Sequence, residues 1–121
     1  MKKNWLIPVA IAAAYAIGRA QGPAGVAPSV APDVKLENNR VRVTELDYHP
    51  AVPREKSIRK ADQVIVFLDD SRYERIDPDT GAKEIRTRKS GDVIWHFKGE
   101  VAPVLTNQDK KTYRTLVIEL K

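Results

Sequence analysis

The sequence predicts an all-β domain, either a sandwich or a barrel. From Lys35 onward, apolar and polar residues alternate with a period of two, in short runs spaced roughly ten residues apart. Turn-forming residues separate these runs, as in "DPDTG". No segment after the N-terminal region has a helical period. A chain of 121 residues with 42% hydrophobic composition has room for one small domain.

The first twenty residues are predicted to be a signal peptide. Lys2 and Lys3 precede an apolar stretch from Trp5 to Ile17, and cleavage is expected after Ala16 or Ala20. The stretch is shorter than the roughly 20 apolar residues that a spanning helix needs. The expected location is therefore periplasmic or secreted. If the segment stays uncleaved, it would instead anchor the chain to a membrane.

Residues 21–33 are rich in Pro, Gly and Ala and are expected to form a flexible linker, with the folded domain at 34–121. The formal charge of +5 includes Lys2, Lys3 and Arg19, and removing these three leaves +2 for the rest. Acidic and basic residues alternate along that remainder, so no phosphate-binding stripe and no nucleic-acid partner are expected. Cysteine is absent, which excludes disulfides, thiolate metal sites and lipid attachment at a cysteine.

The strands are expected in the following order. In "NRVRVTELDY", Val41 and Val43 are expected to point inward, with a bulge near Thr44 that moves Leu46 and Tyr48 to the other face. "QVIVFL" is apolar on both faces, which predicts cover on both sides. "SRYERI" and "KEIRTRK" flank a hairpin turn, "GDVIWHF" follows a glycine turn, and "YRTLVIEL" ends the domain with one apolar side: Leu116, Ile118 and Leu120.

The order and spacing of five segments resemble a small single-domain cupin over Lys35 to Lys121. The segments are "ENNRVRVTELDY", "DQVIVFLDD", "SGDVIWHFKGE", Asn107 and "YRTLVIELK". This resemblance implies a small jelly-roll β-barrel, and it places glycine positions of the family at Ala51, Asp70, Gly91 and Gly99.

The resemblance also implies where the metal ligands of the family would fall. Its two paired histidines fall at Ser57 and Arg59, its glutamate at Gln63, and its third histidine at Ala102 or Pro103. These side chains are poor ligands for a divalent metal, and a guanidinium repels one. We therefore expect no metal, no cofactor and no metal-dependent dioxygenase chemistry.

Arg59 is the main candidate binding residue. If it points into the barrel, it offers bidentate recognition of a carboxylate or phosphate, with Gln63 and Ser57 as further polar contacts. The alternative is that it belongs to a solvated basic run, "REKSIRK". The first reading predicts a non-catalytic binding or accessory protein for a small anionic or polar ligand.

His96 is the candidate for a second reading. Metal-free relatives with the cupin fold include sugar epimerases, which implies a histidine base paired with a tyrosine acid: Tyr48, Tyr73 or Tyr113. The alternative is a packed or surface histidine, and no carboxylate is expected to orient it. His49 lies in a loop beside Pro50.

A third reading is a structural domain of the cell envelope whose outer surface binds a protein. Separately, the apolar strand Val64 to Leu68 needs cover on its outer side, which predicts a homodimer. A second sheet layer from the same chain is the alternative.

Overall fold

The computed structural model describes residues 29–121. The predicted signal peptide and the linker up to Pro28 lie outside the described residues. Within the described part, no helix has the length and apolarity required to cross a bilayer. The strands are β2 (Pro32–Glu37), β3 (Val41–Tyr48), β4 (Pro53–Arg54), β5 (Ser57–Ile58), β6 (Gln63–Phe67), β7 (Ser71–Ile76), β8 (Lys83–Arg88), β9 (Val93–His96), β10 (Val101–Ala102), β11 (Val104–Asn107) and β12 (Tyr113–Leu120).

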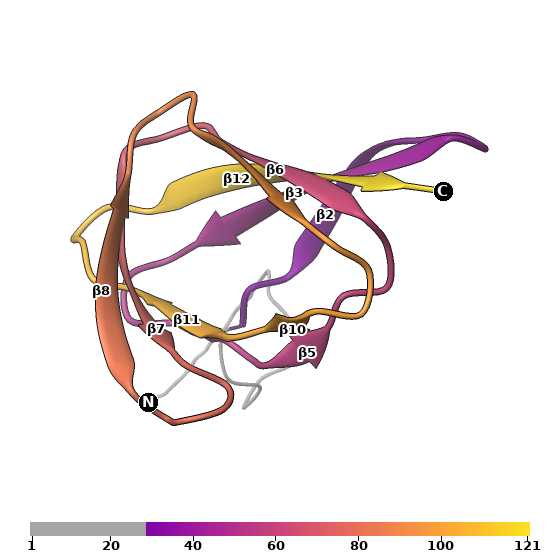
Figure 1. Cartoon of the computed structure of the whole chain (residues 1–121). Coiled ribbons are helices and arrows are strands. Elements are labelled where there is room, and N and C mark those ends of the chain that lie inside the picture. Colours follow the sequence, from indigo (N-terminus) through magenta and orange to yellow (C-terminus); the bar gives the residue numbers. More distant parts are fainter. Residues whose placement is uncertain (1–28) are drawn as a thin grey trace, which may run out of the picture.

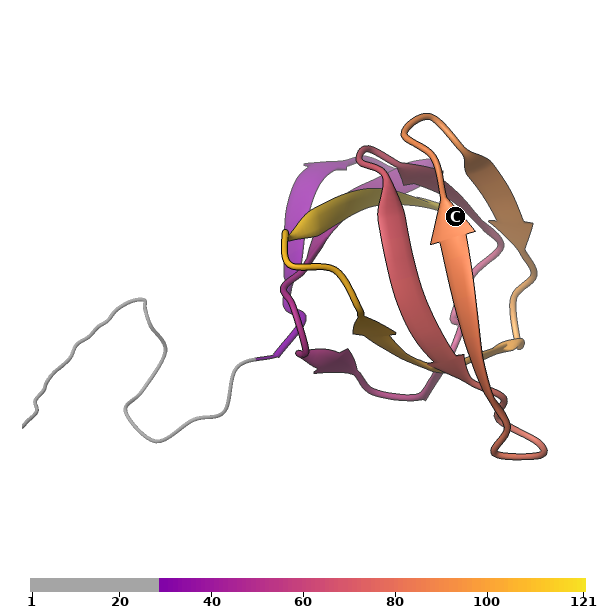
Figure 2. The same cartoon turned by 90° about the vertical axis from the view of Figure 1, so that its left-hand side faces the viewer.

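The strands form two main antiparallel sheets that face each other around a common interior (Figure 1). The larger sheet has the order β2-β3-β12-β6-β9, the smaller has β4-β11-β7-β8, and β5 pairs with β10 beside them. Figure 2 shows the two sheets curving toward one another, with β7 and β8 as a long hairpin on one side. Because β2 begins at Pro32, Pro32 and Asp33 belong to a strand and not to the linker.

The interior contains the side chains that alternate along the strands of the larger sheet. On β12 these are Tyr113, Thr115 and Val117, and on β6 they are Gln63, Ile65 and Phe67, all of them buried. Thr115 pairs with Phe67, and Val117 with Ile65, so the inward side chains of the two strands meet. The burial pattern confirms the period of two in both segments.

The prediction for β3 was wrong about its direction. Leu46 and Tyr48 point inward and Val43 lies on the outer side, the reverse of the expected assignment. Because β3 pairs with β12 without a break from Val41 to Tyr48, no bulge changes its face. Val43 pairs with Ile118 on the outer side, whereas Thr44 is buried on the inner side and Arg42, on that same side, is exposed near the start of the strand. The irregularity in pairing lies instead in β2, between Val34 and Leu36.

The outer face of the larger sheet is apolar and only partly covered. A row of paired residues crosses all five strands: Leu36, Val43, Ile118, Val64 and Trp95. Val64 and Val66 are partly exposed, so the expected cover on both sides of β6 is not present within the described chain. Leu116, Ile118 and Leu120 lie on this outer face, on one side as predicted.

Ala51, in the loop after β3, and Asn107, the last residue of β11, hold the chain at one end of the barrel. Ala51 has a φ of 64°, a left-handed conformation that favours glycine, and it occupies a glycine position implied by the resemblance. Asn107 is 2% exposed. Its side-chain amide donates to the backbone oxygens of Tyr48 and Lys111, each at 2.8 Å. The Asn107 side chain therefore links the β11–β12 connection to the end of β3 by hydrogen bonds.

Candidate functional site

The interior of the barrel holds a cavity of about 490 Å³. Strands from both main sheets supply its walls, chiefly β6, β9 and β12 from the larger sheet and β7, β8 and β11 from the smaller. A cavity of this size is within the range of small-molecule sites, roughly 300–1,000 Å³. The lining combines apolar and aromatic side chains with five arginines and two acidic residues, so its charged part is mostly cationic.

Four aromatic rings form one wall, which we call the aromatic wall: Tyr48, Phe67, Tyr73 and Tyr113. Tyr48 and Tyr113 stack with 4.7 Å between ring centroids and 7° between planes. The rings of Phe67 and Tyr73 are nearly parallel, with 6.2 Å between centroids and 5° between planes. Tyr113 lies 6.3 Å from Phe67 and 6.1 Å from Tyr73, so it joins the two pairs.

Arginines stand at both ends of the aromatic wall. At one end, Arg54 donates from Nη1 to the Tyr48 hydroxyl at 3.2 Å and from Nη2 to the Pro103 carbonyl. At the other, Arg88 donates from Nε to the Tyr73 hydroxyl at 3.3 Å and lies 5.8 Å above the Phe67 ring. None of the ion pairs formed by residues 29–121 involves either arginine.

Arg59 also lines the cavity and is 9% exposed, so of the two alternatives for this residue its position favours the inward one over the solvated basic run. The nearby residues of the basic run, Lys56 and Lys60, are exposed. Burial lowers the pKa of Arg59, the neighbouring Arg54 lowers it further, and Glu100 opposes both effects. The Nε atoms of Arg59 and Arg54 are buried and have no hydrogen-bond partner among the described residues. The cavity therefore contains cationic donors that the surrounding protein leaves unsatisfied.

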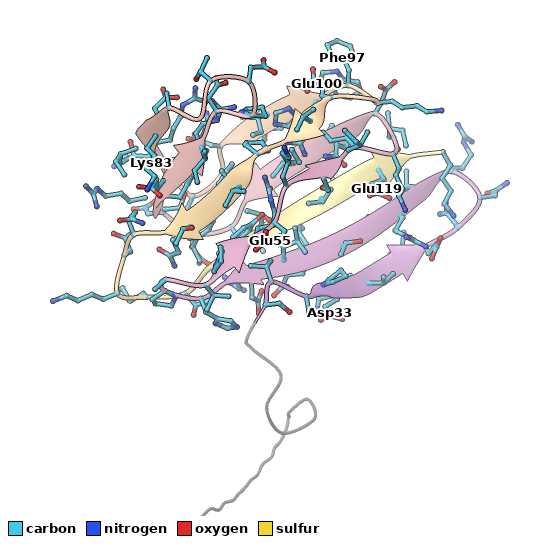
Figure 3. The ribbon with its side chains drawn as sticks, turned by 90° about the horizontal axis from the view of Figure 1, so that it is seen from below. Asp33, Glu55, Lys83, Phe97, Glu100 and Glu119 are labelled. Atoms are coloured by element: carbon cyan, nitrogen blue, oxygen red, sulfur yellow. The ribbon has the colours of Figure 1, made fainter. Side chains whose placement is uncertain are left out.

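His96 lines the same cavity and, contrary to the prediction, a carboxylate does orient it. The Nδ1 of His96 lies 2.9 Å from Oε1 of Glu100. Glu100 follows the turn at Gly99, and its backbone N–H donates to the Phe97 carbonyl at 3.2 Å, so the turn after β9 returns the carboxylate to the imidazole. Figure 3 labels Glu100 and Phe97, which lie close together at one edge of the barrel. Burial lowers the pKa of His96, although the hydrogen bond to Glu100 acts against it.

Gln63 and Ser57 are the predicted polar contacts beside Arg59. They line a smaller compartment of about 370 Å³ between β2–β3 and β5, and Arg59 lines this compartment too. Gln63 is buried, whereas Ser57 is exposed. Arg59, Arg54 and Tyr48 line both compartments, so they form the boundary between them. His49 lies outside the cavity, with its Nδ1 2.9 Å from the Thr112 hydroxyl.

The residues at the implied metal positions do not fit a divalent cation. Arg59 brings a positive charge into the cavity, and Ala102 has no ligand atom in its side chain. Within residues 29–121, no three His, Cys, Asp or Glu side chains gather where they could hold a metal ion. No step of the chemistry proposed below uses a metal.

Sequence reasoning missed Arg54, Arg88 and Glu100 as cavity residues. Arg88 alternates along β8 with outward residues. Its neighbours are polar on both faces, so the sequence of β8 does not predict which face points into the barrel. Glu100 follows the glycine turn at Gly99, where the period of two no longer applies. A charged residue four positions after His96 was the available clue.

No protein-family model and no curated protein sequence matches this chain. Solved structures do resemble it. A cupin domain from Bordetella pertussis Tohama I has a TM-score of 0.69 and 21% identity, covering 78% of this chain and 95% of its own. A double-stranded β-helix protein from Klebsiella pneumoniae has a TM-score of 0.61 and 15% identity, covering 88% of each chain.

The polyketide cyclase RemF from Streptomyces resistomycificus is similar over a smaller part, with a TM-score of 0.55 and 23% identity. The alignment covers 69% of this chain and 56% of RemF. At these identities the resemblances establish the architecture alone. Residues 29–121 form a jelly-roll β-barrel with the fold of cupin domains. This follows from the two facing antiparallel sheets, the cavity between them and the similarity to these solved structures.

Proposed function

We propose that this protein binds a small organic anion in the barrel cavity and acts as a binding or accessory protein. The observation that carries the proposal is Arg59, a buried guanidinium whose Nε has no partner among residues 29–121. A buried charge is costly unless an opposite charge and hydrogen bonds compensate it. An anion entering the cavity would supply both.

The surrounding charges favour the same sign of ligand. Arg54 and Arg88 line the cavity and form no ion pair within the described chain. The nearest acid to Arg59, Glu100, is hydrogen-bonded to His96. A guanidinium matches the two oxygens of a carboxylate or phosphate with two parallel hydrogen bonds. The cavity is therefore suited to a carboxylate on an organic body.

Thermal-shift and calorimetric titrations test the proposal. A panel of organic carboxylates and phosphates is compared with the corresponding neutral amides, in wild type, Arg59→Met and the exposed control Arg72→Met. A ligand at about 100 times its Kd stabilises a fold by about 2.7 kcal/mol. We expect anions to stabilise wild type and Arg72→Met, and Arg59→Met to lose the response. Equal stabilisation of all three proteins, or of none, contradicts the proposal.

A second candidate function rests on the His96–Glu100 pair. A carboxylate on Nδ1 holds the imidazole in the tautomer that leaves Nε2 as the acceptor, and a lowered pKa keeps His96 neutral near pH 7. Tyr48 shares the cavity and is available as an acid. This arrangement suits a metal-independent isomerase or epimerase that removes a proton beside a carbonyl group.

Deuterium exchange from solvent into 2-keto acids or keto sugars tests this second candidate. The base would take a proton from the carbon beside the carbonyl, leaving an enolate that accepts deuterium from solvent. We expect exchange to disappear in His96→Gln and to fall in Glu100→Gln. Exchange that is unchanged in both variants excludes His96 as the base.

We also propose that the protein works in the periplasm or outside the cell, since residues 1–20 have the pattern of a signal peptide. Intact mass measurement after bacterial expression tests this. The mature chain should begin at Ile17 or Gln21. A chain that keeps its first residues in the soluble cytoplasmic fraction contradicts it.

A further inference from the structure

We infer that the ligand is a planar aromatic acid that carries a hydroxyl group on its ring system. This inference rests on the proposed anion site and specifies the chemistry of its ligand. It draws on two features of the cavity that a generic anion site does not need. One is the aromatic wall, and the other is a pair of buried hydroxyls on β12.

The aromatic wall provides a surface for a flat ring. The rings of Phe67 and Tyr73 are within 5° of parallel, and Tyr48 and Tyr113 are within 7°. All four rings contact the cavity, together with apolar side chains such as Ile65, Ile94 and Leu105. Aromatic pairs add about 0.5–1.5 kcal/mol beyond the burial of their area, so such a wall favours an unsaturated ligand over a saturated one.

The positions of the arginines predict how the ligand is oriented in the cavity. Arg54 bonds to the hydroxyl of Tyr48, and Arg88 bonds to that of Tyr73, so a cation stands beside each of two wall rings. Arg54 and Arg59 lie close together, since both line this cavity and also the smaller compartment next to it. A carboxylate at Arg54 and Arg59 would leave the attached ring against the Tyr48 and Tyr113 stack.

The two buried hydroxyls indicate an oxygen on the ring. Tyr113 and Thr115 lie on the inward face of β12, line the cavity and are each 2% exposed. Neither the Tyr113 hydroxyl nor Oγ1 of Thr115 has a hydrogen-bond partner among the described residues. An unpaired buried hydroxyl costs about 1–3 kcal/mol. A ligand hydroxyl both donates and accepts, so it can pair with either of these side chains.

Calorimetric titration with matched ligands tests the inference. The probes are 2-naphthoate, its saturated counterpart decahydro-2-naphthoate, and the isomeric hydroxy-2-naphthoates. The stacking contribution corresponds to 2-naphthoate binding about 2- to 12-fold more tightly than the saturated acid. At least one hydroxy isomer should bind about 2- to 12-fold more tightly than 2-naphthoate, as expected for one net hydrogen bond.

Two conservative variants separate the ring from the hydroxyls. Tyr113→Phe keeps the stacked ring and Thr115→Val keeps the volume, so both should fold and both should still prefer 2-naphthoate over the saturated acid. At least one of them should lose the preference for the hydroxy isomer. Arg72→Met is the control that keeps both preferences.

The outcomes distinguish this inference from the anion site itself. If the saturated acid binds as tightly as 2-naphthoate, or if no hydroxy isomer binds more tightly than 2-naphthoate, the aromatic hydroxy acid is wrong although the anion site stands. If neither carboxylates nor phosphates bind, the proposed function fails and the inference fails with it.

Discussion

Replacing Arg59 by methionine should stabilise the ligand-free protein. Arg59 is 9% exposed, carries a positive charge beside Arg54, and has an unpaired Nε within the described chain. Methionine keeps a long unbranched side chain and removes the charge. Replacing buried ionic groups by apolar residues is often neutral or stabilising by 1–4 kcal/mol. Because the side chain faces a cavity that admits water, we expect about 1 kcal/mol, the lower end of that range.

Thermal unfolding followed by tryptophan fluorescence and circular dichroism measures this effect. For a domain of this size, 1 kcal/mol corresponds to a Tm increase of roughly 4–8 °C. The buffer should contain a zwitterion and little salt, so that no anion occupies the cavity. Arg72→Met, on the exposed side of β7, should change stability by less than about 0.5 kcal/mol. A Tm that falls by 4 °C or more in Arg59→Met would refute the reasoning, since Arg59 would then be a satisfied structural residue.

Four further predictions concern stability and assembly. Asn107→Ala should lower the unfolding free energy by about 2–4 kcal/mol, because the buried Tyr48 carbonyl and the partly buried Lys111 carbonyl lose their donor. A urea titration that gives less than about 1 kcal/mol would contradict this. Ala51→Gly should raise stability by about 0.5–1 kcal/mol, since its φ of 64° strains any residue with a Cβ, and a lower urea midpoint would count against it. The pKa of His96 is lowered in the folded protein, so neutral His96 contributes stability above the unfolded pKa of about 6.5, and this contribution is lost as the pH falls through the lower folded pKa. The difference in unfolding free energy between wild type and His96→Gln should therefore shrink from pH 8 to pH 5. Light scattering should give a dimer mass for wild type and a monomer mass for Trp95→Lys, because Trp95 is 43% exposed on the apolar outer face of the larger sheet. A monomer mass for wild type would refute the homodimer.

The sequence predicted the fold class because short runs of strand-forming residues recur roughly every ten residues, with turn-forming residues between them. In β6 and β12 every second side chain is buried, which is the pattern that a strand with one covered face produces. The same reasoning reversed β3, since its outward side chains, Val41 and Val43, are apolar and one of its inward ones is Arg42. An apolar outer face makes the inner side of a strand ambiguous to any argument from pattern alone.

The site was predicted in part, and the reason is geometric. Arg59 was found through a family position and His96 through its place in an apolar strand, and both line the cavity. Glu100 was missed because a turn, and not a strand repeat, brings it to His96. The aromatic wall was missed as a unit because its members come from four strands, and only their pairing in space brings the rings together.

A crystal structure of the protein with the carboxylate that binds most tightly in the titrations tests the central claim most directly. We predict that its carboxylate oxygens lie within about 3 Å of the guanidinium nitrogens of Arg59 or Arg54, inside the barrel. An empty cavity at saturating ligand, or a carboxylate bound only on the outer surface, would contradict the account.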